Sequence, residues 1–96
     1  MLKNIGVNSL DYENMHIIDI RSREKYNNNH IPNSINIEVD KLIVAPEKYL
    51  EKDKIYYIYC QRGKTSINAC INLYKLGYNV VNIMGGYENW IINRSN

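Results

Sequence analysis

The chain has 96 residues, of which 45% are hydrophobic and 23% charged, and its formal net charge is +2. A chain of this length has room for one hydrophobic core, and the composition excludes a disordered protein. The small net charge gives no reason to expect a nucleic acid or a membrane as partner, and no apolar run approaches the roughly twenty residues of a membrane helix. We therefore expect a single domain over residues 1–96 and, without a signal-peptide pattern, a cytoplasmic location.

Short β-branched runs alternate with amphipathic segments along the first half of the chain. A buried strand is predicted over residues 16–20, then a short helix capped by Ser22, and a brief strand over residues 34–37. Residues 41–52 are expected to be partly helical, with Pro46 at the start of a helical turn. Residues 55–59 are apolar on both faces, which is typical of a central strand in a parallel sheet.

The second half continues the alternation of strands and helices. A polar loop over residues 60–65 leads into a helix with a broad apolar face, and Gly77 ends that helix. A strand over residues 80–84 and a terminal helix over residues 87–92 follow. This order predicts an α/β fold with a mostly parallel sheet and helices on its faces. Active sites in such sheets lie at the carboxyl ends of the strands, which is where Cys60 falls.

Cys60 is the best candidate for a nucleophile. The amides of the tight loop, the N-terminus of the next helix near residue 65 or 66, and the charges of Arg62 and Lys64 all favour a thiolate and an anion bound beside it. Gly63 supplies a residue that tolerates a positive φ in that loop. An inert buried cysteine at a strand end is the alternative, but the polar loop is poorly suited to burial.

Three ordered segments of the chain, from about His16 to Trp90, resemble the signatures of rhodanese domains. The resemblance implies a five-stranded, mainly parallel sheet flanked by helices on both faces. The segments are Asp19-Ile20-Arg21 with Glu24, Tyr26 and His30-Ile31-Pro32-Asn33-Ser34-Ile35-Asn36; Tyr59-Cys60-Gln61-Arg62-Gly63-Lys64-Thr65-Ser66; and Leu76-Gly77-Tyr78-Asn79-Val80 with Met84-Gly85-Gly86-Tyr87-Glu88-Asn89-Trp90.

The resemblance also implies a sulfurtransferase without a cofactor. Cys60 would take the outer sulfur of a small anionic donor such as thiosulfate, release sulfite, and pass the sulfur from a persulfide to a thiol or a protein cysteine. Asp19 and Arg21 would belong to the framework around the loop. An exposed ion pair that contributes little to stability is an equal alternative. The residues implied to bind the substrate are Gln61, Arg62, Gly63, Lys64, Thr65 and Ser66.

The chain departs from the rhodanese pattern at two places. Asn33 stands where the family usually has Gly, at a position that would need a positive φ, which Asn tolerates. Lys64-Thr65 replaces the Asn-Arg of many single-domain members, so the donor preference stays open.

Two rival functions share the same architecture. Phosphatases and arsenate reductases of this group have a loop one residue longer, and the phosphatases read Cys-x5-Arg, whereas the sixth residue after Cys60 is Ser66. A non-catalytic sulfur-relay or protein-interaction module is the third hypothesis.

The remaining cysteine and histidines are predicted to be structural. Cys70 lies on the apolar face of its predicted helix. We expect it to be a core residue and not to form a disulfide with Cys60. His30 is predicted to belong to a turn, and His16 to be a partly buried packing residue. No spacing among these four residues resembles a zinc site, so no metal is expected.

Overall fold

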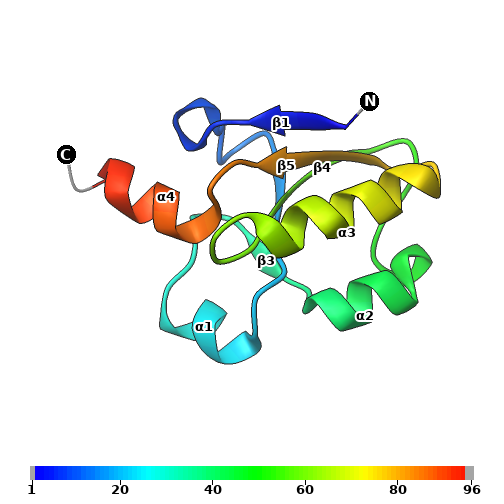
Figure 1. Cartoon of the computed structure of the whole chain (residues 1–96), viewed down its shortest axis with the longest axis horizontal. Coiled ribbons are helices and arrows are strands. Elements are labelled where there is room, and N and C mark those ends of the chain that lie inside the picture. Colours follow the sequence, from blue (N-terminus) through cyan, green and yellow to red (C-terminus); the bar gives the residue numbers. More distant parts are fainter. Residues whose placement is uncertain (1, 95–96) are drawn as a thin grey trace.

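A computed structural model describes residues 2–94 and contains one five-stranded sheet in the order β1-β5-β4-β2-β3. All neighbouring strands within these residues are parallel, so the predicted α/β fold with a five-stranded, mainly parallel sheet is confirmed. Strand β4 is central, between β2 and β5. Figure 1 shows β1 beside β5, at one edge of the sheet. The strands are Lys3–Ile5 (β1), His16–Asp19 (β2), Ile35–Asn36 (β3), Ile55–Tyr59 (β4) and Asn79–Ile83 (β5).

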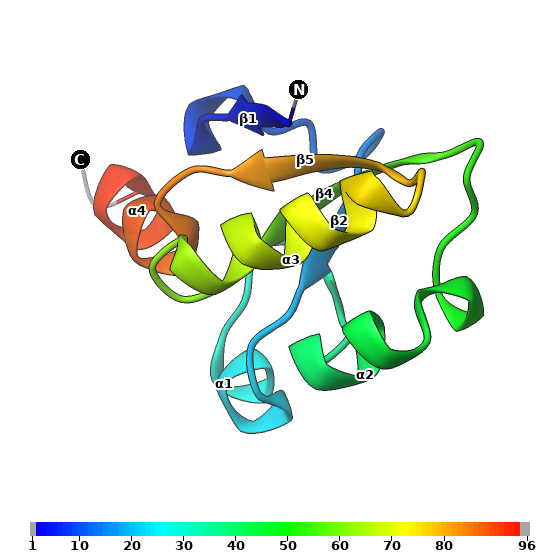
Figure 2. The ribbon, with the colours of Figure 1, turned by 45° about the vertical axis from the view of Figure 1, so that its right-hand side comes forward.

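Helices pack on both faces of the sheet. Helices α2 and α3 share a buried cluster with one face, and α4 and the 3₁₀ turn Val7–Ser9 share a second cluster with the other. Figure 2 shows α3 running along β5, with α1 and α2 together at one side of the molecule. The helices are Arg23–Asn28 (α1), Val39–Val44 (α2), Lys64–Lys75 (α3) and Gly86–Arg94 (α4), and a second 3₁₀ turn spans Pro46–Lys48.

Residues 41–52 are helical in part, as predicted: α2 ends at Val44, and Pro46, which lacks the N–H that would continue α2, starts a 3₁₀ turn. The predicted elements hold in order, with two differences of detail. Strand β1 was not predicted from the residues: it is only three residues long and none of its side chains is fully buried. His16, predicted to be partly buried, is exposed at the start of β2.

Backbone conformations predicted from single residues are confirmed. Asn33 has φ 64°, as expected for a residue in a place that Gly usually fills. Gly77 has φ 95° just after α3 ends. The hydroxyl of Ser22 accepts the N–H of Lys25 and caps α1.

Strand β4 is buried on both faces, and this burial fixes its carboxyl end. Ile58 belongs to the cluster under α2 and α3, whereas Tyr59 points to the cluster with Trp90 of α4. Successive side chains of a strand point to opposite faces, so shifting β4 by one residue would exchange the two sets. The residue after Tyr59 is therefore held in one place.

The buried hydroxyl of Tyr59 joins three segments. It donates to Oδ2 of Asp19 at 2.5 Å, accepts the N–H of Ile31 at 3.1 Å and lies 3.2 Å from Oγ of Ser34. Burial, and then the hydrogen bond to Asp19, raises the pKa of Tyr59 above its ordinary value of 10. The hydroxyl thus fastens the chain between α1 and β3 to the ends of β2 and β4.

Replacing Tyr59 by Phe should lower the free energy of unfolding by about 1–3 kcal/mol, because buried hydrogen-bonding groups lose their partner. Urea unfolding at pH 7 measures the change, and Tyr57→Phe on the same strand is the matched control. The raised pKa favours the neutral hydroxyl in the folded state, so this contribution should be complete below about pH 10 and decline above it. Equal effects of the two substitutions would contradict the role given to the Tyr59 hydroxyl.

Candidate active site

The sulfur of Cys60 lies in a cradle of backbone amides at the carboxyl end of β4. The N–H groups of Gly63 and Ser66 donate to Sγ at 3.1 and 3.2 Å, and Sγ donates to Oγ of Ser66 at 3.4 Å. Helix α3 begins at Lys64, slightly earlier than predicted, so Ser66 belongs to its first turn. Two amides and a helix N-terminus directed at one sulfur favour its anion.

The start of α4 holds this loop in shape. The N–H of Tyr87 donates to the carbonyl of Cys60 at 2.9 Å, and the N–H of Glu88 donates to the carbonyl of Gln61 at 3.0 Å. A Cβ on Gly86 would lie 2.3 Å from the Cys60 oxygen, so only glycine allows this close approach. The segment around Gly86 therefore packs directly against the cysteine loop. The sequence motifs alone did not show this contact.

Gly63 makes the tight turn that the sequence predicted. Its φ is +104°, and it stands immediately before α3. A Cβ there would lie 3.1 Å from the nitrogen of Gly85. Both the conformation and the crowding favour glycine, so the turn brings its own N–H onto the sulfur.

A cavity of about 330 Å³ opens over Cys60 and is rich in positive charge. Sequence reasoning missed Lys25 of α1, because 35 residues separate it from the cysteine. Neither Lys25 nor Lys64 forms a salt bridge within residues 2–94. The cavity is lined by Lys25, Cys60, Gln61, Arg62, Lys64 and Thr65.

The charge of Arg62 is paired with an acidic side chain, a contact that the sequence did not show. Its Nε donates to Oε2 of Glu88 at 2.9 Å, with side chains 79% and 46% exposed. This hydrogen bond lowers the pKa of Glu88 from its ordinary value. Glu88 therefore offsets part of the guanidinium charge, whereas Lys25 and Lys64 form no salt bridge within residues 2–94.

Asp19 and Arg21 form a buried ion pair, so the alternative of an exposed pair is wrong. The charged atoms lie 2.7 Å apart in side chains only 0% and 4% exposed. Arg21 also donates to the carbonyl of Asn29 and to Oε1 of Gln61, and its guanidinium lies 4.0 Å from the ring centroid of Tyr87. Burial alone would lower the pKa of Arg21, but the hydrogen bond and charge of Asp19 outweigh it and raise the pKa. Arg21 thus connects β2, α1, the loop and α4.

The remaining candidates lie outside the cavity. The ring of His30 stacks on Tyr26 and its Nδ1 lies 2.8 Å from the Tyr26 carbonyl oxygen, which fits the predicted structural turn. Cys70 is a free cysteine, fully buried on α3, as predicted. Burial, and then the charge of Cys60 nearby, raises the pKa of the Cys70 thiol to about 12.

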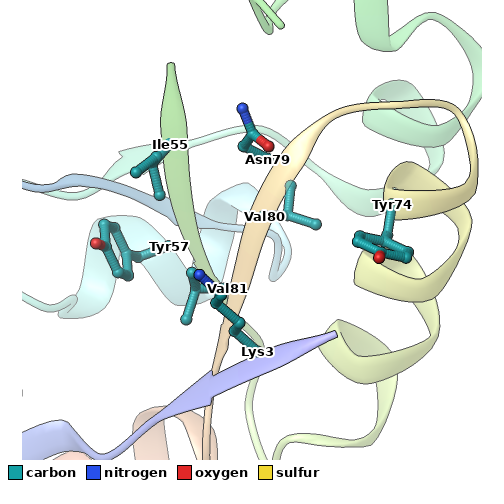
Figure 3. Close-up of a pocket in the computed structure, with 7 residues that line it drawn as sticks. All are labelled: Lys3, Ile55, Tyr57, Tyr74, Asn79, Val80 and Val81. Carbon is teal, nitrogen blue, oxygen red and sulfur yellow. The ribbon is translucent and has the colours of Figure 1, made fainter. Parts of the chain in front are cut away.

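A second hollow, of about 310 Å³, lies at the amino ends of β4 and β5, away from Cys60 (Figure 3). Tyr74 reaches toward it from α3, and Lys3 comes from β1. Among the described residues that line it there is no cysteine, histidine or carboxylate. Its lining consists of Lys3, Ile55, Tyr57, Tyr74, Asn79, Val80 and Val81.

Over residues 2–94, none of the helices combines the length and the apolar character required to cross a bilayer.

The family model of the rhodanese-like domain matches residues 7–93. The chain belongs to the rhodanese-like domain family. This domain is 32% identical over 75 residues to the thiosulfate sulfurtransferase GlpE of Coxiella burnetii, covering 77% of the chain and 69% of that protein. It is 35% identical over 80 residues to YtwF of Bacillus subtilis, covering 81% and 75%.

Larger relatives contain this domain as one part. The adenylyltransferase and sulfurtransferase uba4 of Ogataea parapolymorpha is 34% identical over 76 residues, and the match takes in 78% of the chain but only 20% of uba4. Among solved structures, a rhodanese-related protein from Thermoplasma volcanium has a TM-score of 0.84 at 35% identity, covering 95% of this rhodanese-like domain and 92% of that chain.

The two cysteines of the rhodanese-like domain should differ sharply in reactivity. Iodoacetamide near neutral pH should label Cys60 well before Cys70, because loop amides stabilise the Cys60 thiolate whereas burial keeps Cys70 protonated. Peptide mass spectrometry over a pH series measures both rates. Equal rates in the folded protein, or faster labelling of Cys70, would show that the cradle does not activate its thiol.

Proposed function

We propose that this rhodanese-like domain is a sulfurtransferase that carries sulfane sulfur on Cys60. The donor is thiosulfate or a similar small anion, and the acceptor is a thiol or a protein cysteine. The observation that carries the proposal is the pair of amides, from Gly63 and Ser66, aimed at the sulfur of a cysteine beneath a cationic cavity. Relatives named as sulfurtransferases support it.

The first half-reaction uses the thiolate as nucleophile. The Cys60 thiolate attacks the outer sulfur of thiosulfate, a new sulfur–sulfur bond forms, and the old one breaks with its electron pair leaving on sulfite. Lys25 and Lys64 line the cavity that the dianion enters, so their charges attract it before the attack. The step starts from the thiolate, so the thiol proton of Cys60 has to leave before the attack.

The second half-reaction regenerates the enzyme. A thiolate acceptor attacks the terminal sulfur of the Cys60 persulfide, and the electron pair of the broken bond returns to Sγ. The amides of Gly63 and Ser66 then hold the anionic Sγ again. Hydrogen bonds to a charged group contribute roughly 1.5–3 kcal/mol each, so the leaving thiolate is well stabilised.

The phosphatase alternative lacks its central group. The residue six positions after Cys60 is the buried Ser66, whose hydroxyl donates to Oδ1 of Asn82 at 2.7 Å. The arginine of the loop, Arg62, is paired with Glu88. A sulfur-relay role differs from the proposal only in that a protein supplies the sulfur, so the same persulfide would serve it.

Cys60→Ser should abolish sulfur transfer from thiosulfate to cyanide and leave the fold intact, because a hydroxyl cannot form the persulfide. Cys70→Ser is the matched control and should keep most of the activity. A colorimetric thiocyanate assay measures both. The proposal fails if the variants behave the other way round, or if the protein releases phosphate from aryl phosphates in a reaction that Cys60→Ser removes.

Lys25→Met and Lys64→Met should each raise the KM for thiosulfate up to about fivefold with little change in kcat, as expected for loss of an exposed charge that attracts the donor. Arg62→Met should have a smaller effect because Glu88 already offsets its charge. All effects should shrink at high salt. Lys75→Met, at the far end of α3, is the control. A larger effect at Arg62 than at either lysine would contradict this account of the cavity.

A further inference from the structure

A line of polar side chains runs from the candidate nucleophile through the core to the edge of the sheet. Oγ of Ser66 lies 3.4 Å from Sγ of Cys60 and donates to Oδ1 of Asn82 at 2.7 Å. Nδ2 of Asn82 donates in turn to Oδ1 of Asn4 at 3.0 Å. Asn4 and Asn82 are register partners in β1 and β5, and Asn4 is exposed.

Asn82 is an unusual residue for its place. It is only 1% exposed, and its neighbours in β5, Val81 and Ile83, are apolar core residues. An amide in the core is unfavourable unless it is hydrogen-bonded, and a valine or leucine would suit the strand better. Its two bonds, to Ser66 and Asn4, therefore indicate a role other than packing.

The hydroxyl of Ser66 has one proton, and the direction of that proton decides whether Sγ of Cys60 faces a hydrogen-bond donor or an acceptor. The hydroxyl lies 2.7 Å from Oδ1 of Asn82 and 3.3 Å from the carbonyl oxygen of Gly63, so the shorter distance favours Asn82 as the acceptor of that proton. Oγ of Ser66 is then left to accept the thiol proton of Cys60. This arrangement suits a neutral thiol, because an anionic sulfur needs a donor and not an acceptor.

A carboxamide can serve both states because it carries a donor and an acceptor. If the amide of Asn82 turns over, Nδ2 donates to Ser66, and the hydroxyl of Ser66 is released to donate to the thiolate. Oδ1 of Asn82 then faces Asn4, whose exposed amide turns to donate to it. Every bond of the line is kept with its direction reversed.

We propose that Asn82 is a positioning residue that, with Asn4, reverses this line of hydrogen bonds so that Ser66 stabilises the thiolate of Cys60. The inference rests on the proposed role of Cys60 as nucleophile. It extends that role by giving a function to the core side of the sulfur, opposite the cavity. Asn82 acts only through Ser66 and touches no substrate.

The charged groups that surround the Cys60 cavity stay unchanged in the variants below, so they cannot account for a difference among them. Cys70, the other titratable group of α3 near the sulfur, is also unchanged. These charged groups are Lys25 of α1, Lys64 of α3, Arg62 with Glu88 of α4, and Arg21 with Asp19 of β2.

The test fixes the direction of these hydrogen bonds by a substitution at Asn4, the exposed end of the line. Asn4→Asp offers only acceptors, so it holds Nδ2 of Asn82 and keeps the Ser66 proton away from the sulfur. The half-maximal pH for iodoacetamide labelling of Cys60 should rise by roughly one unit, which is about a tenfold slower labelling at neutral pH. Asn4→Ala leaves water to act as donor or acceptor and should resemble the wild type.

Two controls separate this lock from the added charge. The effect of Asn4→Asp should disappear in the Asn82→Leu background, where the line is cut but the charge remains, and it should persist at high salt. If Asn82→Leu does not fold, the salt series decides alone. Three results would overturn the proposal. The labelling profile of Asn4→Asp could match that of Asn4→Ala, it could shift by the same amount in the Asn82→Leu background, or it could return to the wild-type profile at high salt. Labelling requires no sulfur transfer, so this result is independent of whether the protein is a sulfurtransferase.

Discussion

The buried ion pair of Asp19 and Arg21 is the constraint on which the rest of the site depends. Burying two charges is unfavourable unless their hydrogen bonds are satisfied, and here the partners are drawn from several elements. Asp19 also accepts the hydroxyl of Tyr59, at the end of the neighbouring strand. The pair therefore sets the positions of the strand ends, of Gln61 in the loop and of Tyr87 in α4.

Within this framework, backbone N–H groups form the cradle around the sulfur of Cys60. The backbone groups that contact Sγ are the N–H of Gly63 in the loop and the N–H of Ser66 in the first turn of α3. The first turn of α4 in turn binds the carbonyls of Cys60 and Gln61. A cradle made of amides does not depend on the side chains of Lys64 and Thr65. Those side chains line the cavity instead, so we infer that they affect which donor enters rather than how the sulfur is held.

How much the sequence could predict depended on how local each feature is. The strand before Cys60 and the turn at Gly63 were predicted because an apolar run and a glycine in a polar loop are local signals. The approach of Lys25 and the pairing of Arg62 with Glu88 join segments far apart in the chain, and no local pattern reports them.

Strand β1 and the Asn82 line were missed for related reasons. Strand β1 has three residues and no periodicity, and it forms only because β5 provides an edge. Asn82 interrupts an apolar run, which is a visible anomaly in the sequence, but its partners Ser66 and Asn4 could be found only from the fold. Distant pairings were thus the part of the site that only the structure could supply.

The central claim is that Cys60 carries the transferred sulfur, and intact-protein mass spectrometry tests it most directly. The reduced protein is incubated with thiosulfate, freed of excess donor and weighed, and the modified peptide is then located. We predict a gain of one sulfur atom on the peptide that contains Cys60, reversed by cyanide. A folded protein that gains no sulfur, or one that gains it on Cys70, would contradict the account.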